Sequence, residues 1–72
     1  MTLRSPNGAR LVLAGMSEGK TNAQIGREFG VTHHAIEKYL FEVVYPMVGC
    51  ESPTAQTRRA EAVGRAYRLG IL

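Results

Sequence analysis

The chain has 72 residues, 44% of them apolar, and its nine lysines and arginines against six acidic residues give a formal net charge of +3. A chain of this length forms one domain, here residues 1–72, and buries only ~60% of the surface that it exposes when unfolded. No apolar run reaches the ~18 residues of a membrane span, and the N-terminus lacks the apolar core of a signal peptide, so the composition predicts a cytoplasmic protein without membrane contact.

Helices are the only elements predicted, because no stretch alternates between apolar and polar residues as a strand does. Ser5 and Pro6 have the pattern of an N-cap followed by proline at the first helical position. The first helix is therefore predicted to begin there and to end before Gly19. Its apolar residues recur at the helical period and form one stripe for the core, namely Ala9, Val12, Leu13 and Met16.

Thr21 predicts the start of the second helix, because Gln24 three residues later completes a capping box. Gly30 is placed to end this helix in a left-handed turn. Gly26 costs about 1 kcal/mol of helix propensity relative to alanine, so we expect another helix to approach closely there. The buried edge of the helix is predicted to be Ile25 and Phe29.

Thr32 is predicted to cap the third helix, after Val31 has turned inward. The helical period then places three residues of this helix in the core, namely Ile36, Leu40 and Val43. By the same period, three apolar residues lie on its outward side, namely Phe41, Val44 and Tyr45. Pro46 prevents the helix from continuing undisturbed, so residues 46–51 are predicted to form a loop.

The last helix is predicted to begin at Ser52 and Pro53, with Thr54 and Thr57 as alternative caps, and to run to about Leu69. Gly70 would end it, and residues 71–72 are expected to fold back onto the domain. Its predicted buried positions are Ala62, Val63, Ala66 and Tyr67. Together the elements predict an all-α fold, a small four-helix domain that contains a helix-turn-helix.

The helix-turn-helix prediction depends on residues 30–32, which join the second and third helices. Ile25 and Ile36 would anchor the pair, and the small Gly26 would allow the helices to cross closely. This arrangement leaves the second helix of the pair projecting, as entry into a DNA major groove requires. The alternative to this interpretation is an ordinary small helical bundle.

Residues 19–32 have the sequence GKTNAQIGREFGVT, residues 35–40 have AIEKYL, and residues 62–72 have AVGRAYRLGIL. They resemble three stretches of the C-terminal domain of LuxR and GerE type transcription regulators. Residues 19–32 resemble the family's run of a glycine, small polar residues, EIA, LG and a serine cap. Residues 35–40 stand where the family has TVKNHL, and residues 62–72 resemble its ending AVALALRLGLI. The resemblance covers the chain from the first helix to its end. The last stretch, residues 62–72, separates the chain from region 4 of sigma factors, whose helix pair looks similar.

This resemblance implies a stand-alone bacterial or phage domain that binds duplex DNA sequence-specifically and regulates transcription. Its recognition helix, residues 32–45, would enter the major groove, and its last helix would be available for a homodimer. It also implies no enzymatic activity and no cofactor. Consistently, the single Cys50 has no partner for an internal disulfide, and His33 and His34 have no accompanying cysteine or acidic cluster for a metal site.

Candidate DNA contacts follow from these two helices. Lys38 is placed to contact guanine or phosphate, and His33 and His34 a base edge or phosphate, although the histidines are equally well explained as ordinary surface residues. The start of the second helix resembles the family's phosphate anchor, with cationic residues flanking it. The full set of candidates is Lys20, Thr21, Asn22, Arg27, His33, His34, Glu37, Lys38 and Phe41.

Two outward positions of the third helix depart from the family, which often has basic residues there. They hold Glu37 and Phe41, and Lys38 against Glu37 and Glu42 gives residues 32–49 a formal charge of −1. That sign is unexpected for a helix among phosphates. Glu37 would accept a hydrogen bond from a cytosine amino group, but a salt pair with Lys38 or plain solvation is the more ordinary role for such a carboxylate.

These departures support an alternative hypothesis, in which the chain is a protein-binding module. As a phage or host factor it would present Phe41 and Tyr45 to RNA polymerase or to another regulator. A phage DNA-packaging or replication accessory is a third hypothesis. For dimer or partner contact the candidates are Tyr45, Gly64, Arg65 and Arg68, while Arg58 and Arg59 would touch the DNA backbone or solubilise a dimer face.

Overall fold

Helices form all of the regular structure in the described part of the chain, which comprises residue 3, residue 5 and residues 7–72 of a computed structural model. The elements are α1 (Gly8–Ser17), α2 (Asn22–Phe29), α3 (His33–Tyr39), the π-helical η1 (Leu40–Val44), α4 (Tyr45–Val48) and α5 (Ala55–Arg68). Since α3, η1 and α4 follow one another without a break, there are four helical segments, as predicted. The all-α fold is thus confirmed.

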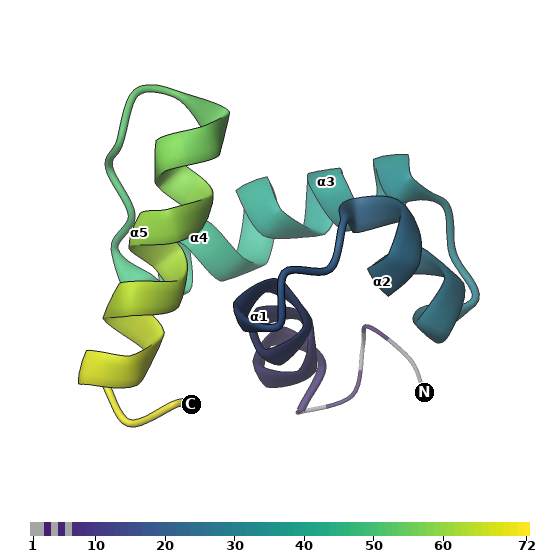
Figure 1. The fold of residues 1–72 in the computed structure, drawn as a ribbon, viewed down its shortest axis with the longest axis horizontal. Coiled ribbons are helices and arrows are strands. Elements are labelled where there is room, and N and C mark those ends of the chain that lie inside the picture. The colour runs from purple at the N-terminus through teal and green to yellow at the C-terminus, as the bar shows by residue number, and fades with distance from the viewer. Residues whose placement is uncertain (1–2, 4, 6) are drawn as a thin grey trace.

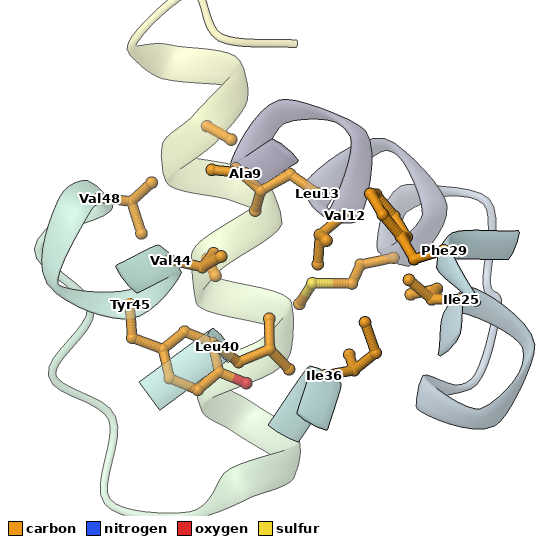
Figure 2. Close-up of a cluster of buried hydrophobic side chains, with 13 residues drawn as sticks. Ala9, Val12, Leu13, Ile25, Phe29, Ile36, Leu40, Val44, Tyr45 and Val48 are labelled. Carbon is orange, nitrogen blue, oxygen red and sulfur yellow. The ribbon is translucent and has the colours of Figure 1, made fainter. Parts of the chain in front are cut away.

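The long segment of α3, η1 and α4 is the centre of the domain. In Figure 1 it runs horizontally, with α2 packed near its beginning, α5 near its end and α1 below it. The core draws on all four segments (Figure 2) and consists of Ala9, Val12, Leu13, Met16, Ile25, Phe29, Ile36, Leu40, Val44, Tyr45, Val48, Ala62 and Ala66. Over the described ranges, no helix combines the length and the apolar character needed to cross a membrane.

α1 begins at Gly8, later than the predicted start at Ser5. The Ser5 carbonyl accepts a hydrogen bond from the Gly8 N–H at 3.0 Å, directly before the helix. Asn7 occupies the N-cap position without a side-chain hydrogen bond. Pro6, which was predicted to occupy the first helical position, lies outside the described residues. The predicted end before Gly19 is confirmed.

α2 has the capping box that its sequence predicts. The Gln24 N–H donates to Thr21 Oγ1 at 3.1 Å, and the Thr21 N–H donates to Gln24 Oε1 at 2.8 Å. Gly30 ends the helix in the left-handed conformation, with φ of 73°. Thr32 then caps α3 through the Ala35 N–H. Both helix starts are therefore set by contacts three residues apart.

Gly26 is needed because backbone approaches it closely, although not from another helix as predicted. A Cβ at this position would lie 2.6 Å from the Val31 carbonyl oxygen, in the turn that leads into α3. The same turn leaves the Val31 side chain 36% exposed, so the prediction that Val31 turns inward is wrong. Its backbone, not its side chain, is what packs against α2.

A π-helical turn separates α3 from α4. The Tyr45 N–H donates to the Leu40 carbonyl five residues earlier. In a regular α-helix the ring of Pro46 would collide with the carbonyl of Glu42 and would leave it without a donor. The wider turn accommodates this proline, as π turns often do at irregular points of a helix.

The π turn changes which residues face the core. Val44 and Tyr45, predicted outward, are 0% and 6% exposed, whereas Val43, predicted in the core, is 40% exposed. The extra residue in the turn shifts the apolar period by one position. The predicted loop at residues 46–51 is also wrong, because the chain remains helical to Val48 and turns only at Gly49.

α5 begins at Ala55 with Thr54 as its N-cap, not at Ser52 and Pro53. The other predicted cap, Thr57, instead donates its N–H to Thr54 Oγ1 at 3.3 Å. The return of residues 71–72 is confirmed by their N–H groups, which donate to the Ala66 carbonyl. Of the residues predicted to be buried, Ala62 and Ala66 are fully buried and Val63 is partly buried. The prediction for Tyr67 is wrong, because this side chain is 57% exposed.

Two helix-interior glycines provide a matched test of the packing. Gly26→Ala is expected to lower the free energy of unfolding by about 1–3 kcal/mol, because its Cβ would overlap the Val31 carbonyl. Gly64→Ala is expected to raise it by about 0.4–1 kcal/mol, because a Cβ there would meet only the Arg68 guanidinium at 3.8 Å. Urea unfolding followed by circular dichroism measures both, and a shift of the same sign in the two variants would contradict the assignment of Gly26.

Candidate nucleic-acid interface

Three elements that are distant in sequence meet around one groove of about 310 Å³. They are the start of α2, the exposed side of α3 and η1, and the start of α5. The residues that line this surface, which we call the three-helix groove, are Asn22, Glu37, Leu40, Phe41, Tyr45, Ala55, Gln56 and Arg59. The groove thus brings two helix starts beside the helix that was predicted to enter DNA.

Arg59 joins α5 to the start of α2. Its Nη1 donates to Asn22 Oδ1 at 2.6 Å, and its Nη2 donates to the Lys20 carbonyl. The candidate phosphate anchor is therefore held by a residue from the last helix. Because the Asn22 carbonyl oxygen accepts from Arg59, the Asn22 amide N–H₂ is the part of this side chain that remains for a DNA contact.

Arg58 lies over the aromatic rings beside the groove. Its guanidinium carbon is 5.1 Å from the Phe41 ring centre and 5.7 Å from that of Tyr45, within the range of cation–π attraction. The two rings pack edge to face at 5.4 Å, and Arg58 Nε donates to the Ser52 carbonyl at 2.8 Å. Arg58 is thus fixed both by the loop before α5 and by the aromatic pair.

The aromatic pair has one exposed and one buried member. Phe41 is 47% exposed, as its predicted position on the outward face requires, whereas Tyr45 is 6% exposed. Burial raises the pKa of the Tyr45 hydroxyl above its ordinary value. The prediction of Tyr45 as a partner contact is therefore wrong, since the π turn rotates this side chain into the core.

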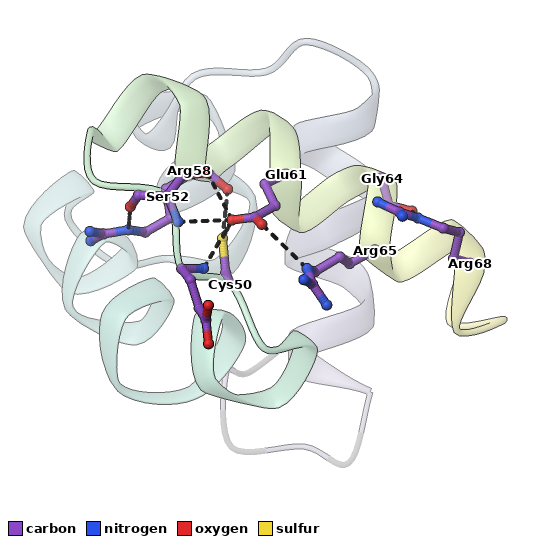
Figure 3. A network of polar contacts seen from close by, with 8 residues as sticks. Cys50, Ser52, Arg58, Glu61, Gly64, Arg65 and Arg68 are labelled. Atoms are coloured by element: carbon purple, nitrogen blue, oxygen red, sulfur yellow. Dashed lines mark hydrogen bonds and ion pairs between the residues drawn. The ribbon is translucent and has the colours of Figure 1, made fainter.

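Glu61 organises the loop that leads into α5 (Figure 3). Its Oε1 accepts four hydrogen bonds, from the Cys50 thiol at 3.0 Å, the Ser52 hydroxyl at 2.9 Å and the N–H groups of Glu51 and Ser52, both at 2.9 Å. The Cys50 thiol and then Ser52 are the main causes that lower the pKa of the Glu61 carboxyl to about 2. One carboxylate thereby holds residues 50–52 against α5.

Cys50 is partly buried beside this carboxylate, in agreement with a structural role for it. Burial, followed by its hydrogen bond to Glu61, raises the pKa of the thiol to about 11. The thiolate is the nucleophilic form of cysteine, so this thiol is poorly reactive at neutral pH. Ser52, held in the same loop, supplies the carbonyl that fixes Arg58.

Two arginines of α5 offset the negative charge of the third helix at the three-helix groove. Arg58 and Arg59 lie beside it, and within the described ranges neither forms an ion pair. Together with Glu37, which lines the groove, they give two positive charges and one negative charge, a formal sum of +1. The negative sign of residues 32–49 is thus outweighed by residues of α5.

Other candidate residues at the start of α2 are engaged within the protein. Lys20 Nζ lies 3.0 Å from Glu28 Oε2 and 3.6 Å from Glu18 Oε2, and the bond to Glu28 raises the pKa of Lys20. Its charge is therefore neutralised locally. Thr21 acts in the capping box, and Arg27 is exposed in the last turn of α2, where it is not among the residues lining the groove.

The first turns of α3 expose the remaining candidates. The rings of His33 and His34 lie 4.0 Å apart, and His34 Nδ1 is 3.9 Å from Glu37 Oε2. Lys38 is exposed but does not form the ion pair with Glu37 that was one of three roles predicted for this carboxylate. Glu37 therefore keeps its acceptor oxygens at the groove.

Of the candidate dimer residues, Gly64, Arg65 and Arg68 lie toward the end of α5 (Figure 3), whereas Tyr45 lines the three-helix groove. Arg65 Nε is 3.4 Å from Glu61 Oε2, and Arg68 Nε lies 3.5 Å from the Gly64 carbonyl. Among the described residues, a Cβ at Gly64 would have only the Arg68 guanidinium within 4 Å, at 3.8 Å, so no other helix requires glycine there. Packing within the monomer, the alternative reason for this glycine, is thus excluded for the described residues.

A second, larger groove of about 640 Å³ lies on the other flank of α3. Sequence reasoning missed it, because it placed Val43 in the core and Met47 in a loop. Both are exposed, at 40% and 45%. The groove is lined by Leu3, Ser5, Ala9, Ala35, Lys38, Tyr39, Glu42, Val43 and Met47.

No protein-family model matches the chain, and neither a curated protein nor a solved structure matches it. The resemblance to LuxR and GerE type regulators therefore remains a prediction from the sequence stretches. In the part of the chain that the structure describes, no three histidine, cysteine or acidic side chains are grouped as metal ligands would be. The function is accordingly argued from the geometry of the three-helix groove.

Glu61 and Ser52 are structurally important residues that sequence reasoning did not identify. A glutamate within the first half of a helix has no distinctive pattern, and its four donors come from a loop about ten residues earlier. For Arg58 and Arg59 the sequence left two roles open. In the structure Arg59 lines the three-helix groove, and Arg58 lies over the ring of Phe41 beside it.

The Glu61 network predicts a specific pH dependence. The pKa of Glu61 falls from 4.5 to about 2 on folding, so its ionised form stabilises the fold above about pH 4.5, and this contribution is lost as the pH falls toward 2. Glu61→Gln should therefore lower the thermal unfolding midpoint at pH 7 and approach the native protein near pH 2. Glu51→Gln, which keeps its backbone donor, serves as the control and should match the native protein throughout. A deficit of Glu61→Gln that persists unchanged to pH 2 would contradict this assignment.

Proposed function

We propose that this chain binds duplex DNA sequence-specifically, as a small transcription regulator. In this proposal α2, the turn at residues 30–32 and α3 form a helix-turn-helix, and the exposed side of α3 and η1 enters the major groove. The observation that carries the proposal is the position of Arg58 and Arg59, two cations without a carboxylate partner among the described residues, beside that exposed side. They supply the positive field that the third helix lacks.

The geometry of α3 supports insertion into a groove. Ile36 and Leu40 are buried, which anchors one side of the helix to the core. The other side, with His33, His34, Glu37, Lys38 and Phe41, is exposed along its length. A major groove about 12 Å wide accepts one α-helix, and these side chains would then face base edges.

Phosphate contacts would come from both flanks of α3. Unbonded N–H groups at a helix start attract phosphate oxygens, and α2 and α5 both start at the three-helix groove. Arg59 and the amide of Asn22 add side-chain donors on the α2 flank. Arg58 adds a cation on the α5 flank, so the backbone on each side of a bound groove would meet positive charge.

The alternative, a protein-binding module, has less support. Its two predicted anchors were Phe41 and Tyr45, of which Tyr45 is buried and only Phe41 is exposed. A DNA-packaging or replication accessory would bind DNA through the same surface without selecting an operator. Regulation of transcription is therefore the part of the proposal that rests on the family resemblance.

Arginine variants test DNA binding. Arg58→Gln and Arg59→Gln should each weaken binding to random-sequence duplexes at low salt, because each removes a cation that displaces counterions. The slope of log affinity against log salt should become shallower by about 0.9 for each lost phosphate contact. Fluorescence anisotropy measures this slope, and circular dichroism checks that each variant is folded.

Lys20→Gln is the matched control for this experiment. It removes the same charge from a residue that Glu28 and Glu18 already neutralise, so the salt slope should stay close to that of the native protein. A native protein that binds no duplex at low salt would refute the proposed function. Equal changes for Lys20 and the two arginines would show that only net charge acts.

The proposal includes a two-fold dimer through α5. Gly64 costs about 1 kcal/mol of helix propensity without any packing reason in the monomer, and close approach of a second α5 would supply one. Gly64→Leu should then leave a folded monomer and weaken binding to a duplex with two half-sites 34–36 Å apart more than to a single half-site. Sedimentation of the native protein as a monomer, both free and on the two-site duplex, would exclude this dimer.

A further inference from the structure

Glu37 and Phe41 are the acidic and the aromatic residue on the exposed side of α3 and η1, where a surface made only for phosphates would have cations. Both line the three-helix groove. Building on the proposed function, we infer that they determine its sequence specificity. Glu37 selects a cytosine through its N4 amino group, and Phe41 selects a thymine through its 5-methyl group.

The carboxylate of Glu37 is free to act as an acceptor. Its side chain is 53% exposed, and the basic side chain that lies near it is His34, whose Nδ1 is 3.9 Å from Glu37 Oε2. Only cytosine N4 and adenine N6 offer hydrogen-bond donors in the major groove. Adenine also presents the N7 acceptor beside its amino group, which repels a carboxylate, so Glu37 favours cytosine. Arg58 and Arg59 at the same groove offset the repulsion between Glu37 and phosphates.

Phe41 presents an apolar ring that is held in one orientation. Tyr45 packs against it edge to face with an interplanar angle of 90°, and the Arg58 guanidinium lies over it. The ring nevertheless remains 47% exposed. The 5-methyl group of thymine is the apolar group that the major groove offers to such a ring. Because the ring is already fixed, little side-chain entropy is lost on contact.

The spacing of the two residues constrains the spacing of the two bases. They lie four positions apart, which corresponds to about 6 Å along a helix that rises 1.5 Å per residue. Bases along one DNA strand are about 3.4 Å apart. The selected cytosine and thymine should therefore lie within about two base-pair steps of each other, on the same strand or on opposite strands.

The first experiment selects bound sequences from a pool of random duplexes at low salt with the native protein. We expect a cytosine and a thymine, at most about two steps apart, to be enriched in the retained sequences. Replacement of that thymine by deoxyuracil in the best duplex removes only the methyl group, and it should lower affinity by about threefold to tenfold. This loss should disappear in Phe41→Ala, because the variant has no ring to contact the methyl group.

Val43→Ala is the matched control for Phe41→Ala. Val43 is a similarly exposed apolar residue of η1, at 40%, but it lines the other groove. This variant should keep the discrimination between thymine and deoxyuracil. For Glu37, exchange of the selected C·G pair for T·A should weaken the native protein about tenfold and should weaken Glu37→Ala less than twofold.

The outcomes separate this inference from the proposed function. Retention of duplexes without a cytosine and thymine preference, or equal affinity of the native protein for the thymine and deoxyuracil duplexes, would overturn the inference and leave DNA binding intact. Failure to retain any duplex at low salt would overturn both. The deoxyuracil comparison uses the native protein and changes only the DNA. It therefore remains decisive even if Phe41→Ala or Glu37→Ala does not fold.

Discussion

The π turn at Leu40–Val44 determines how α3 is placed relative to the last helix, α5. Pro46 removes a hydrogen-bond donor and demands space near the Glu42 carbonyl, and the wider turn provides that space. Its extra residue directs Val44, Tyr45 and Val48 into the core. A regular α-helix would have buried Val43 and left Tyr45 at the surface. α5 could not then have packed as it does against this stretch.

The contacts that attach α5 are also those that assemble the candidate interface. Arg59 reaches the start of α2, and Arg58 rests on the ring of Phe41 and the buried Tyr45. Glu61 holds the preceding loop, because one of its oxygens accepts four hydrogen bonds from residues 50–52. A single exposed ion pair, by contrast, usually contributes little to stability. Stability and surface charge are therefore coupled, since a change that detaches α5 also removes the cations beside α3.

This coupling accounts for the unusual composition of the third helix. Standing alone, Glu37 and Glu42 would make residues 32–49 repel phosphate. With Arg58 and Arg59 beside it, one acidic group at the groove does not make the local charge negative. Contacts with α5 and with the core also hold Phe41 in place. Arg58 and Tyr45 pack against its ring, which nevertheless remains about half exposed.

The sequence by itself determined the features that depend on residues three to five positions apart. The capping box of Thr21 and Gln24, the cap at Thr32 and the left-handed turn at Gly30 are local hydrogen-bonding patterns, and the structure has all of them. The stripe of α1 and the buried Ile25, Phe29, Ile36 and Leu40 follow from the helical period in the same way. These patterns are legible because both partners of each contact belong to one short segment.

Only the tertiary structure decided what lies beyond the π turn and what surrounds the groove. The period gave no sign of an inserted residue, so the roles of Val43, Val44 and Tyr45 came out reversed. The start of α5 at Ala55 depends on the loop that Glu61 holds, and the partners of Arg59 lie 37 and 39 positions earlier. Such contacts join segments whose mutual placement follows from packing of the whole core, which no local pattern encodes.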